Sequence, residues 1–377
     1  MDFNLSDDQR EMRSLAARIL DDATDADTVP EPPQNGATYD KDLWSTLAEA
    51  GLLGMSISEQ GGGMGFGLVE LGLLLEEQGR TLAPVPLTAT IAMAAMTIDR
   101  YGSAEERDAW LARIVSGDAI MTAAITECGN HDALAPMAKA ESDGNRYKLS
   151  GTKVAVPYAP QAEAFIVTAE AEGGPALFIV EACTDGLTVE TQVSTSGEPL
   201  GLVTLDDVEL AGDAVVGSIE TGGDVIADLV ARSRVALAQR QVGIAGEALR
   251  RTAAYSSERI QFGKPLGSMQ AVQQRAADAF IDVEAMRSSA LLAAWQIDHD
   301  ASSIADVAAA KYWAAMGGHR VVHTAQHLHG GTGADITYPI HRFFLHAIHI
   351  SEELGGASPM AAEIGKAIAE GRTEALT

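Results

Sequence analysis

The hydrophobic pattern of this chain changes its period twice, and this change limits the folds that the chain can adopt. Residues 1–117 repeat apolar side chains at helical spacing, and long Ala- and Leu-rich helical segments return over residues 218–377. Residues 118–217 break into short β-rich runs, separated by turn residues such as Gly173 and Gly174. The order predicts an α+β protein in which these ranges are an N-terminal α-helical domain, a β-domain and a C-terminal four-helix-bundle domain.

Local signals place several elements inside these blocks. Ser6 with Gln9 and Ser103 with Glu106 match the capping box that begins a helix. Long helices of the last block are expected over 224–259, 269–299 and 302–329. The β-rich runs cover residues 119–126, 146–156, 164–171, 176–182 and 203–210.

Charge and composition exclude several classes of partner. The chain has 26 Lys and Arg against 53 Asp and Glu, and the resulting net charge of −27 repels nucleic acid and acidic membrane surfaces. Pro84 and Pro86 interrupt the uncharged run 81–98, which predicts a short buried helix rather than a membrane span. The acidic N-terminus does not resemble a signal peptide, and Cys128 and Cys183 are expected as small buried residues. A cytoplasmic protein is predicted.

Four motifs occur in a fixed order along the chain. They are Ser58-Glu59-Gln60-Gly61-Gly62-Gly63 followed by Leu74 to Arg80, Val203 to Val208, Glu258 to Pro265, and His329-Gly330-Gly331-Thr332-Gly333. Together they resemble the acyl-CoA dehydrogenase family over nearly the whole chain. The resemblance implies FAD as cofactor and an acyl-CoA thioester as substrate. It also implies a carboxylate that removes the α-proton while a hydride passes from the β-carbon to the flavin.

The position of that carboxylate is not filled in this chain. Matched without gaps from Tyr338-Pro339, the usual base position of the family falls on Leu354, which cannot accept a proton. A second position, used by a minority of members, falls on Ser233. Glu353 adjoins the usual position, but one residue along a helix turns a side chain by about 100°. No catalytic residue is therefore assigned, and Glu353 is the remaining candidate.

The family positions that hold a subunit's own flavin have also changed. Thr126 is retained, whereas Asp132 stands in place of a serine near the pyrophosphate. Ala155 replaces the tryptophan that stacks on the flavin, and Pro157 replaces a hydroxyl residue and has no N–H to donate. The resemblance therefore predicts a defective flavin pocket in this chain.

The positions that contact a neighbouring subunit's flavin are largely kept. In the family they bind the adenine-side half of an FAD across a subunit interface, and they match here at Arg259, Phe262, Gly263, Gln270, Gly330, Gly331 and Gly333. His327 stands where a glutamine is usual. An arginine offers several fixed donors to a pyrophosphate, and glycines let backbone N–H groups approach it.

This selective loss predicts a non-catalytic subunit. The chain resembles one half of bacterial α2β2 heterotetrameric acyl-CoA dehydrogenases that act on steroid side chains. Its partners would be a second acyl-CoA dehydrogenase subunit, an acyl-CoA and an electron-transfer flavoprotein. Two alternatives remain: a homotetrameric enzyme with Glu353 as base, and a flavin-free acyl-CoA binding protein, which would not need Arg259.

Histidines are concentrated near the C-terminus. Seven of the nine lie between residues 319 and 349, and His319, His323 and His327 repeat at helical spacing. Such spacing suits a metal, but no carboxylate or cysteine lies close by in the sequence. The histidines are predicted to be interface residues, and no metal site is predicted.

Overall fold

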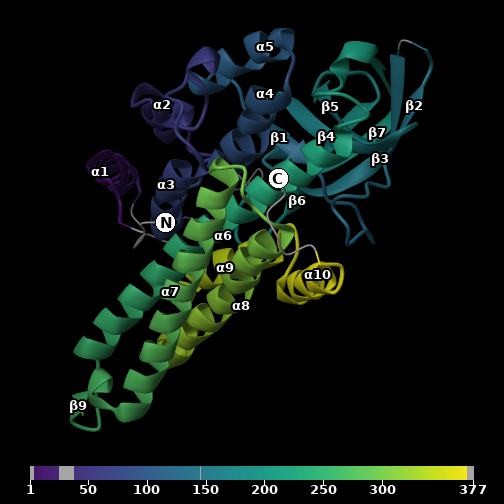
Figure 1. Cartoon of the computed structure of the whole chain (residues 1–377). Coiled ribbons are helices and arrows are strands. Elements are labelled where there is room, and N and C mark those ends of the chain that lie inside the picture. The colour runs from purple at the N-terminus through teal and green to yellow at the C-terminus, as the bar shows by residue number, and fades with distance from the viewer. Residues whose placement is uncertain (1–3, 25–37, 145, 372–377) are drawn as a thin grey trace. The chain divides into compact units, whose positions relative to one another are not determined.

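The computed structural model describes residues 4–24, 38–144 and 146–371 (Figure 1). The chain divides into two compact units. Unit 1 comprises Met1–Glu31, Leu68–Ala83 and Arg234–Thr377, and unit 2 comprises Pro32–Gly67 and Pro84–Ser233. The predicted α+β class and the order of helices, sheet and helices are confirmed. Each compact unit draws on separate stretches of sequence, so the three-domain division stays a prediction.

Unit 1 is a helix bundle. Its helices are α1 (Asp7–Ala23), α3 (Leu68–Thr81), the larger part of α6 (Gly222–Glu258), α7 (Gln270–Asp298), α8 (Ile304–His329), α9 (Ile340–Glu352) and α10 (Ala357–Ala369). Helix α8 packs on α7, α9 and α10. Between α6 and α7 lie a two-stranded hairpin, β8 (Ile260–Gln261) and β9 (Lys264–Pro265), and the short helix η6 (Leu266–Ser268). The three long helices expected from the sequence are confirmed to within two residues at each end.

The core of unit 1 explains the composition of α6. This helix is buried on all sides from Val235 to Ala245, as is typical of a central bundle helix. Leu237 and Ile244 pack with Phe343 and Ile350 of α9 in one apolar cluster. A second cluster joins α6 to α7 and α8 and includes Val242, Val283, Met286 and Val321.

Unit 2 combines short helices with a sheet. The helices are α2 (Lys41–Glu49), η1 (Leu52–Gly54), η2 (Glu59–Gly61), η3 (Leu87–Ala95), α4 (Met96–Tyr101), α5 (Ala104–Val115), η4 (Ala159–Gln161) and η5 (Gly212–Ala214). The strands are β1 (Met121–Ala124), β2 (Lys139–Ser142), β3 (Arg146–Pro157), β4 (Ala164–Ala171), β5 (Gly174–Glu181), β6 (Leu187–Val193) and β7 (Pro199–Ala211). Strands β1 and β2 pair parallel with successive parts of β4, β5 pairs antiparallel with β4, and β3, β7 and β6 follow antiparallel beyond β2.

Several local predictions can be checked directly. Both capping boxes form, at Ser6 with Gln9 and at Ser103 with Glu106. The uncharged segment after Pro86 is a buried helix as expected, although Leu87–Ala95 is wound as a π-helix. No helix in the described part of the chain is both long and apolar enough to cross a membrane.

The prediction of buried cysteines is wrong. Cys128 and Cys183 are both free and exposed. Cys128 lies in the loop after β1, and Cys183 lies in the turn after β5, where the backbone runs over the surface.

Candidate functional site

Three aromatic rings bring the end of α6 and the end of α8 together. Tyr255 lies one turn before Arg259 and stacks on His329, with ring centroids 4.3 Å apart and an interplanar angle of 24°. Tyr338 lies 6.3 Å from the Tyr255 ring and 5.4 Å from the His329 ring. Since Gly330 directly follows His329, the cluster holds the Arg259 segment near the glycine turn η7 (Gly330–Ala334). We call residues 259–270 together with residues 327–331 the bundle end.

Arg259 is held by its backbone and exposed at its side chain. Its N–H donates to the Tyr255 carbonyl at 2.8 Å, and its own carbonyl accepts from the Leu266 N–H at 2.9 Å. Within the described residues its guanidinium has no hydrogen-bond or ion-pair partner, whereas Arg250 and Arg251 both pair with Glu247. An exposed guanidinium without an internal partner is available to an external anion.

Phe262, in the turn of the hairpin, has an exposed ring and a left-handed backbone, both of which are unfavourable in an isolated chain. Its side chain is 91% exposed, and its φ of 53° lies in the left-handed region that bulky residues avoid. Ile260 of the same hairpin is also exposed, at 55%, and adjoining exposed apolar side chains are typical of a surface that meets another molecule. Gln270, at the first position of α7, and His327, on α8, are exposed as well.

The glycine turn presents an open backbone face. A Cβ placed on Gly330 or Gly331 would meet no atom within 4 Å, so internal packing does not require the glycine at 331. A Cβ on Gly333 would instead come within 2.6 Å of the Gln326 side chain. The open face at Gly330 and Gly331 therefore fits a ligand group that approaches the backbone closely, as a diphosphate does.

His329 adds a buried acceptor that sequence reasoning did not single out. Its side chain is buried, and its Nδ1 lies 2.8 Å from the Ala325 carbonyl, so Nδ1 carries the proton. Burial lowers its pKa, which keeps the imidazole neutral. Its Nε2 is buried without a partner in the part of the chain that the structure describes. The signal available beforehand was its place in the glycine motif.

The predicted base position is filled by a packed leucine. Leu354 has a φ of 53° and packs against the α9 core cluster. Its carbonyl accepts a hydrogen bond from Arg234 Nε at 3.0 Å, and Arg234 also pairs with Glu363 at 3.0 Å. The side chain at 354 thus serves the core and supplies no proton acceptor.

Glu353 lies beyond the end of α9. It is the C-cap residue with an extended backbone, so the expectation that a helical rotation separates it from position 354 is wrong. Its carboxylate lies 3.9 Å from His349 Nε2, and its side chain is only 16% exposed. Neither observation assigns it a catalytic role.

A buried lysine closes the C-terminus of the same helix. Lys311 Nζ donates to the carbonyls of Ile350 and Ser351 at 2.7 and 3.1 Å. Burial lowers the pKa of Lys311 to about 7, while the nearby Glu353 opposes this shift. We call residues 350–356 the base-position loop; the carbonyls of Ile350, Ser351 and Leu354 in it accept hydrogen bonds from buried basic side chains of the same chain.

The positions predicted for a flavin of the chain's own lie in unit 2. Thr126 is exposed, and its carbonyl accepts from the Val154 N–H at 2.9 Å. Ala155 has a φ of 52°, and its N–H already donates to Gln192 Oε1 at 2.8 Å. Pro157 has no N–H, so this segment of β3 offers little to hydrogen-bond a flavin.

The loop after Thr126 is anchored by a buried ion pair. Glu127 lies 2.8 Å from Lys153 Nζ, with both side chains almost fully buried, and accepts from the N–H groups of Met137 and Ala138 at 2.6 and 2.7 Å. Asp132 is exposed on this loop, and its carboxylate accepts from the Leu134 N–H at 3.0 Å. The loop keeps a defined frame but presents a negative charge.

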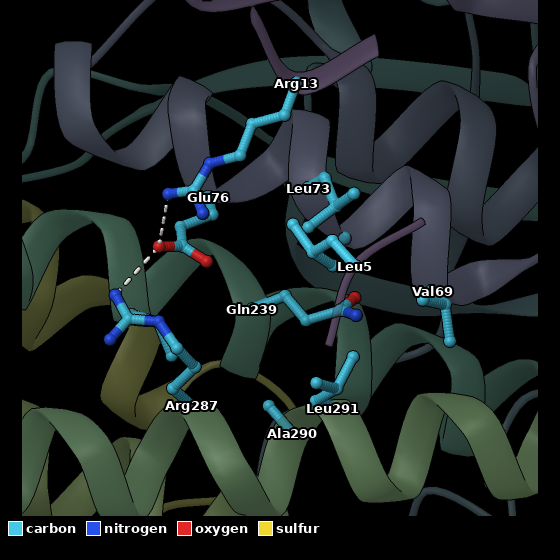
Figure 2. A pocket seen from close by; sticks show the side chains of 11 residues that line it. Leu5, Arg13, Val69, Leu73, Glu76, Gln239, Arg287, Ala290 and Leu291 are labelled. Atoms are coloured by element: carbon cyan, nitrogen blue, oxygen red, sulfur yellow. Dashed lines mark hydrogen bonds and ion pairs between the residues drawn. The ribbon is translucent and has the colours of Figure 1, made fainter. Parts of the chain in front are cut away.

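A separate pocket lies among α1, α3, α6 and α7 in unit 1 (Figure 2). It measures about 110 Å³, and Arg13 and Arg287 converge there on Glu76, at 2.9 and 2.8 Å. Pockets that bind drug-sized ligands measure about 300–1,000 Å³, so this pocket is too small for an acyl-CoA. None of the predicted site residues lines this pocket.

Comparison with known proteins agrees with this arrangement. Residues 6–118 match the acyl-CoA dehydrogenase N-terminal domain model, and residues 220–368 match the C-terminal domain model. Acyl-CoA dehydrogenase FadE27 of Mycobacterium tuberculosis is 37% identical over 98% of this chain and 99% of its own length.

Solved structures extend the likeness. A chain of a variant of the Tcur3481-Tcur3483 steroid ACAD has a TM-score of 0.90 and 42% identity, over 97% of this chain and 98% of its own. A chain of the ChsE4-ChsE5 complex from Mycobacterium tuberculosis has a TM-score of 0.91 and 36% identity, over 98% and 99%. The predicted cofactor is in keeping with a further neighbour at 26% identity, PigA, solved as an FAD complex. From its motifs, its fold and these relatives, the chain belongs to the acyl-CoA dehydrogenase family.

Proposed function

We propose that this chain is the non-catalytic subunit of a heteromeric, FAD-dependent acyl-CoA dehydrogenase. The observation that carries the proposal is a contrast inside unit 1. Arg259 has no partner among the described residues at the open bundle end, whereas the predicted base position holds Leu354, a partly buried leucine that packs against the α9 cluster. A chain that catalysed the reaction alone would need a proton acceptor at position 354. A chain that never contacted a flavin would not need an Arg259 that is unpaired among the described residues.

The bundle end would complete a flavin site on the partner. Arg259 would neutralise the diphosphate of an FAD held mainly by the partner, and the N–H groups of Gly330 and Gly331 would bind it from their open face. Phe262, Gln270 and His327 would contact its adenine side. When bound, FAD accepts the hydride that leaves the β-carbon of the acyl group.

The remaining parts of the reaction would come from the partner subunit. Leu354 cannot take up a proton, and Ala155 and Pro157 give this chain neither an aromatic face nor a free donor for an isoalloxazine. Thr126 is the residue of the predicted flavin pocket that this chain retains. It is exposed, and its carbonyl is hydrogen-bonded to β3, so its side chain is accessible to a flavin. The base and the stacking tryptophan are therefore assigned to the partner.

The acyl group is proposed to be steroid-like. Support comes from a related structure described as a steroid ACAD, and from the two-component names of both related complexes. An electron-transfer flavoprotein is proposed as the electron acceptor and the cytoplasm as the location, both by resemblance to the family.

The test is the flavin absorbance of the purified chain, expressed alone and together with an acyl-CoA dehydrogenase subunit that keeps the tryptophan and the carboxylate. We expect a colourless chain alone and a yellow complex with one flavin per pair of subunits. Stoichiometric FAD on the chain alone would overturn the proposal and favour the homotetrameric enzyme with Glu353 as base. Acyl-CoA binding without flavin or partner would favour the flavin-free binding protein.

A further inference from the structure

Two exposed histidines face each other on α8. The Nε2 atoms of His319 and His323 lie 3.1 Å apart, and their ring centroids are 4.2 Å apart. The ring of His323 also meets the ring of Phe344 from α9 edge to face, at 4.8 Å and 78°. Both histidines are exposed, so the atoms between the rings are reached from solvent.

The separation of the two nitrogens matches the bite of a metal ion. A divalent transition metal binds imidazole nitrogen at about 2.0–2.1 Å, so two nitrogens at adjacent tetrahedral or octahedral positions are about 2.8–3.4 Å apart. The 3.1 Å between the Nε2 atoms lies within this range. A hydrogen bond between the rings requires a proton on one Nε2, which a metal would replace.

We propose that His319 and His323 form a two-imidazole binding site for a divalent transition metal, with solvent completing the coordination. The described residues contain no group of three or more histidine, cysteine or carboxylate side chains that could hold a metal, so the protein supplies two ligands. The affinity is therefore below that of a four-ligand structural zinc site. Cu²⁺ binds most tightly, ahead of Ni²⁺ and Zn²⁺, because exposed imidazole pairs follow the general stability order of these ions.

The positive charge nearest to the pair in the sequence is neutralised within the chain. A metal binds imidazole in its neutral form, and an unpaired cation beside the pair would oppose binding. The neighbouring cation, Arg320, is paired with Asp282 of α7 at 2.9 Å. Sequence alone did not predict a metal here, because spacing shows two histidines on one helix face but not whether their nitrogens converge.

The experiment is a calorimetric titration of the EDTA-treated, tag-free full chain with CuCl₂, NiCl₂ and ZnCl₂. We expect one Cu²⁺ per chain, with weaker Ni²⁺ and Zn²⁺ binding. The variants His319→Gln and His323→Gln each remove half of a chelate, so their affinity should fall by about 10-fold or more. The matched control is His299→Gln, an exposed histidine that stacks on Trp295 and has no second imidazole against it among the described residues.

The outcomes separate the site from general histidine binding. Unchanged affinity in either variant of the pair, or an equal loss in His299→Gln, would overturn the proposal. Because the titration measures metal and not flavin, its result does not depend on the proposed subunit role. Repeating it on the co-purified heteromer should give the same stoichiometry, and loss of the site there would overturn its relevance to the assembled protein. Circular dichroism of the exposed-site variant His319→Gln checks that it is folded.

Discussion

The bundle end and the base-position loop both lie at helix C-termini in unit 1, yet their cations behave in opposite ways. At the base-position loop, Arg234 and Lys311 turn inward and donate to the carbonyls of Leu354, Ile350 and Ser351. At the bundle end, the Arg259 guanidinium has no partner within the described residues. The difference indicates that the basic side chains of the first region stabilise the fold, whereas Arg259 is available to a second molecule.

The strongest effect is expected in the structural region. The substitution Arg234→Met leaves Glu363 and the Leu354 carbonyl without their hydrogen-bond donor. It should therefore lower the free energy of unfolding by about 3 kcal/mol. Urea denaturation of the chain measures this change. An effect within about 0.5 kcal/mol, on the scale of exposed ion pairs, would mean that the loop is not held by Arg234.

The next effect concerns the bundle end. Arg259→Ala should weaken FAD retention by the heteromer by about 10- to 100-fold, because a hydrogen bond to a charged group is worth about 1.5–3 kcal/mol. Stability of the chain should not change, since the guanidinium makes no hydrogen bond or ion pair with the described residues. FAD dissociation followed by flavin fluorescence is the measurement. Arg250→Ala is the control, because it also removes one positive charge, from a residue of α6 that pairs with Glu247. An equal loss of FAD affinity in the two variants would mean that net charge alone matters.

Substitutions of two glycines in the same turn should have different effects, because Gly333 is closely packed and Gly331 is open. Gly333→Ala should destabilise the chain by about 1–3 kcal/mol, because its Cβ would press on the Gln326 backbone and side chain. Gly331→Ala should leave stability within about 0.5 kcal/mol but weaken FAD binding to the heteromer. Thermal unfolding and flavin titration of both variants test this. The opposite assignment of effects would show that Gly331 is kept for packing.

The pH dependence of stability tests Lys311. Its pKa is lowered to about 7 in the folded chain from an ordinary value of 10.5, so the unfolded chain binds more protons between these values. Stability should therefore rise with pH from about 7 upward, by at most about 1.4 kcal/mol per pH unit, with no pH-dependent contribution from Lys311 below pH 7. Urea denaturation across pH 6–10 should show a shallower slope in Lys311→Met, and identical slopes would refute a lowered pKa.

The smallest effect is expected from substitution of Glu353. Glu353→Gln should leave the turnover of the heteromer within about twofold, because the base is assigned to the partner and a substitution away from the chemistry changes little. Steady-state turnover with an acyl-CoA and an artificial electron acceptor measures this. A fall of several orders of magnitude would restore the homotetrameric enzyme with Glu353 as base.

Most of the fold followed from local pattern, and the strands that were missed show why some did not. Residues 139–142, Lys-Ala-Glu-Ser, have little β propensity and form β2 because β3 and β4 offer open edges on either side. Apolar and polar side chains partly alternate over residues 187–193, and this pattern indicates the strand β6 that the prediction omitted. Pairing with the neighbouring strands β3 and β4, rather than intrinsic β propensity, decided the first case.

Residue order alone was enough to identify the family and the helix positions, and to predict that position 354 lacks the family's carboxylate. These depend on residue identity and on spacing within one element, which are local properties. Which cations are paired within the chain became clear from the folded structure and not before. Arg234 meets Leu354 and Glu363 from positions 120 and 129 residues away, whereas Arg259 meets no such partner among the described residues. Charge pairing depends on distances of a few ångströms between side chains, and these distances arise only when the helices pack.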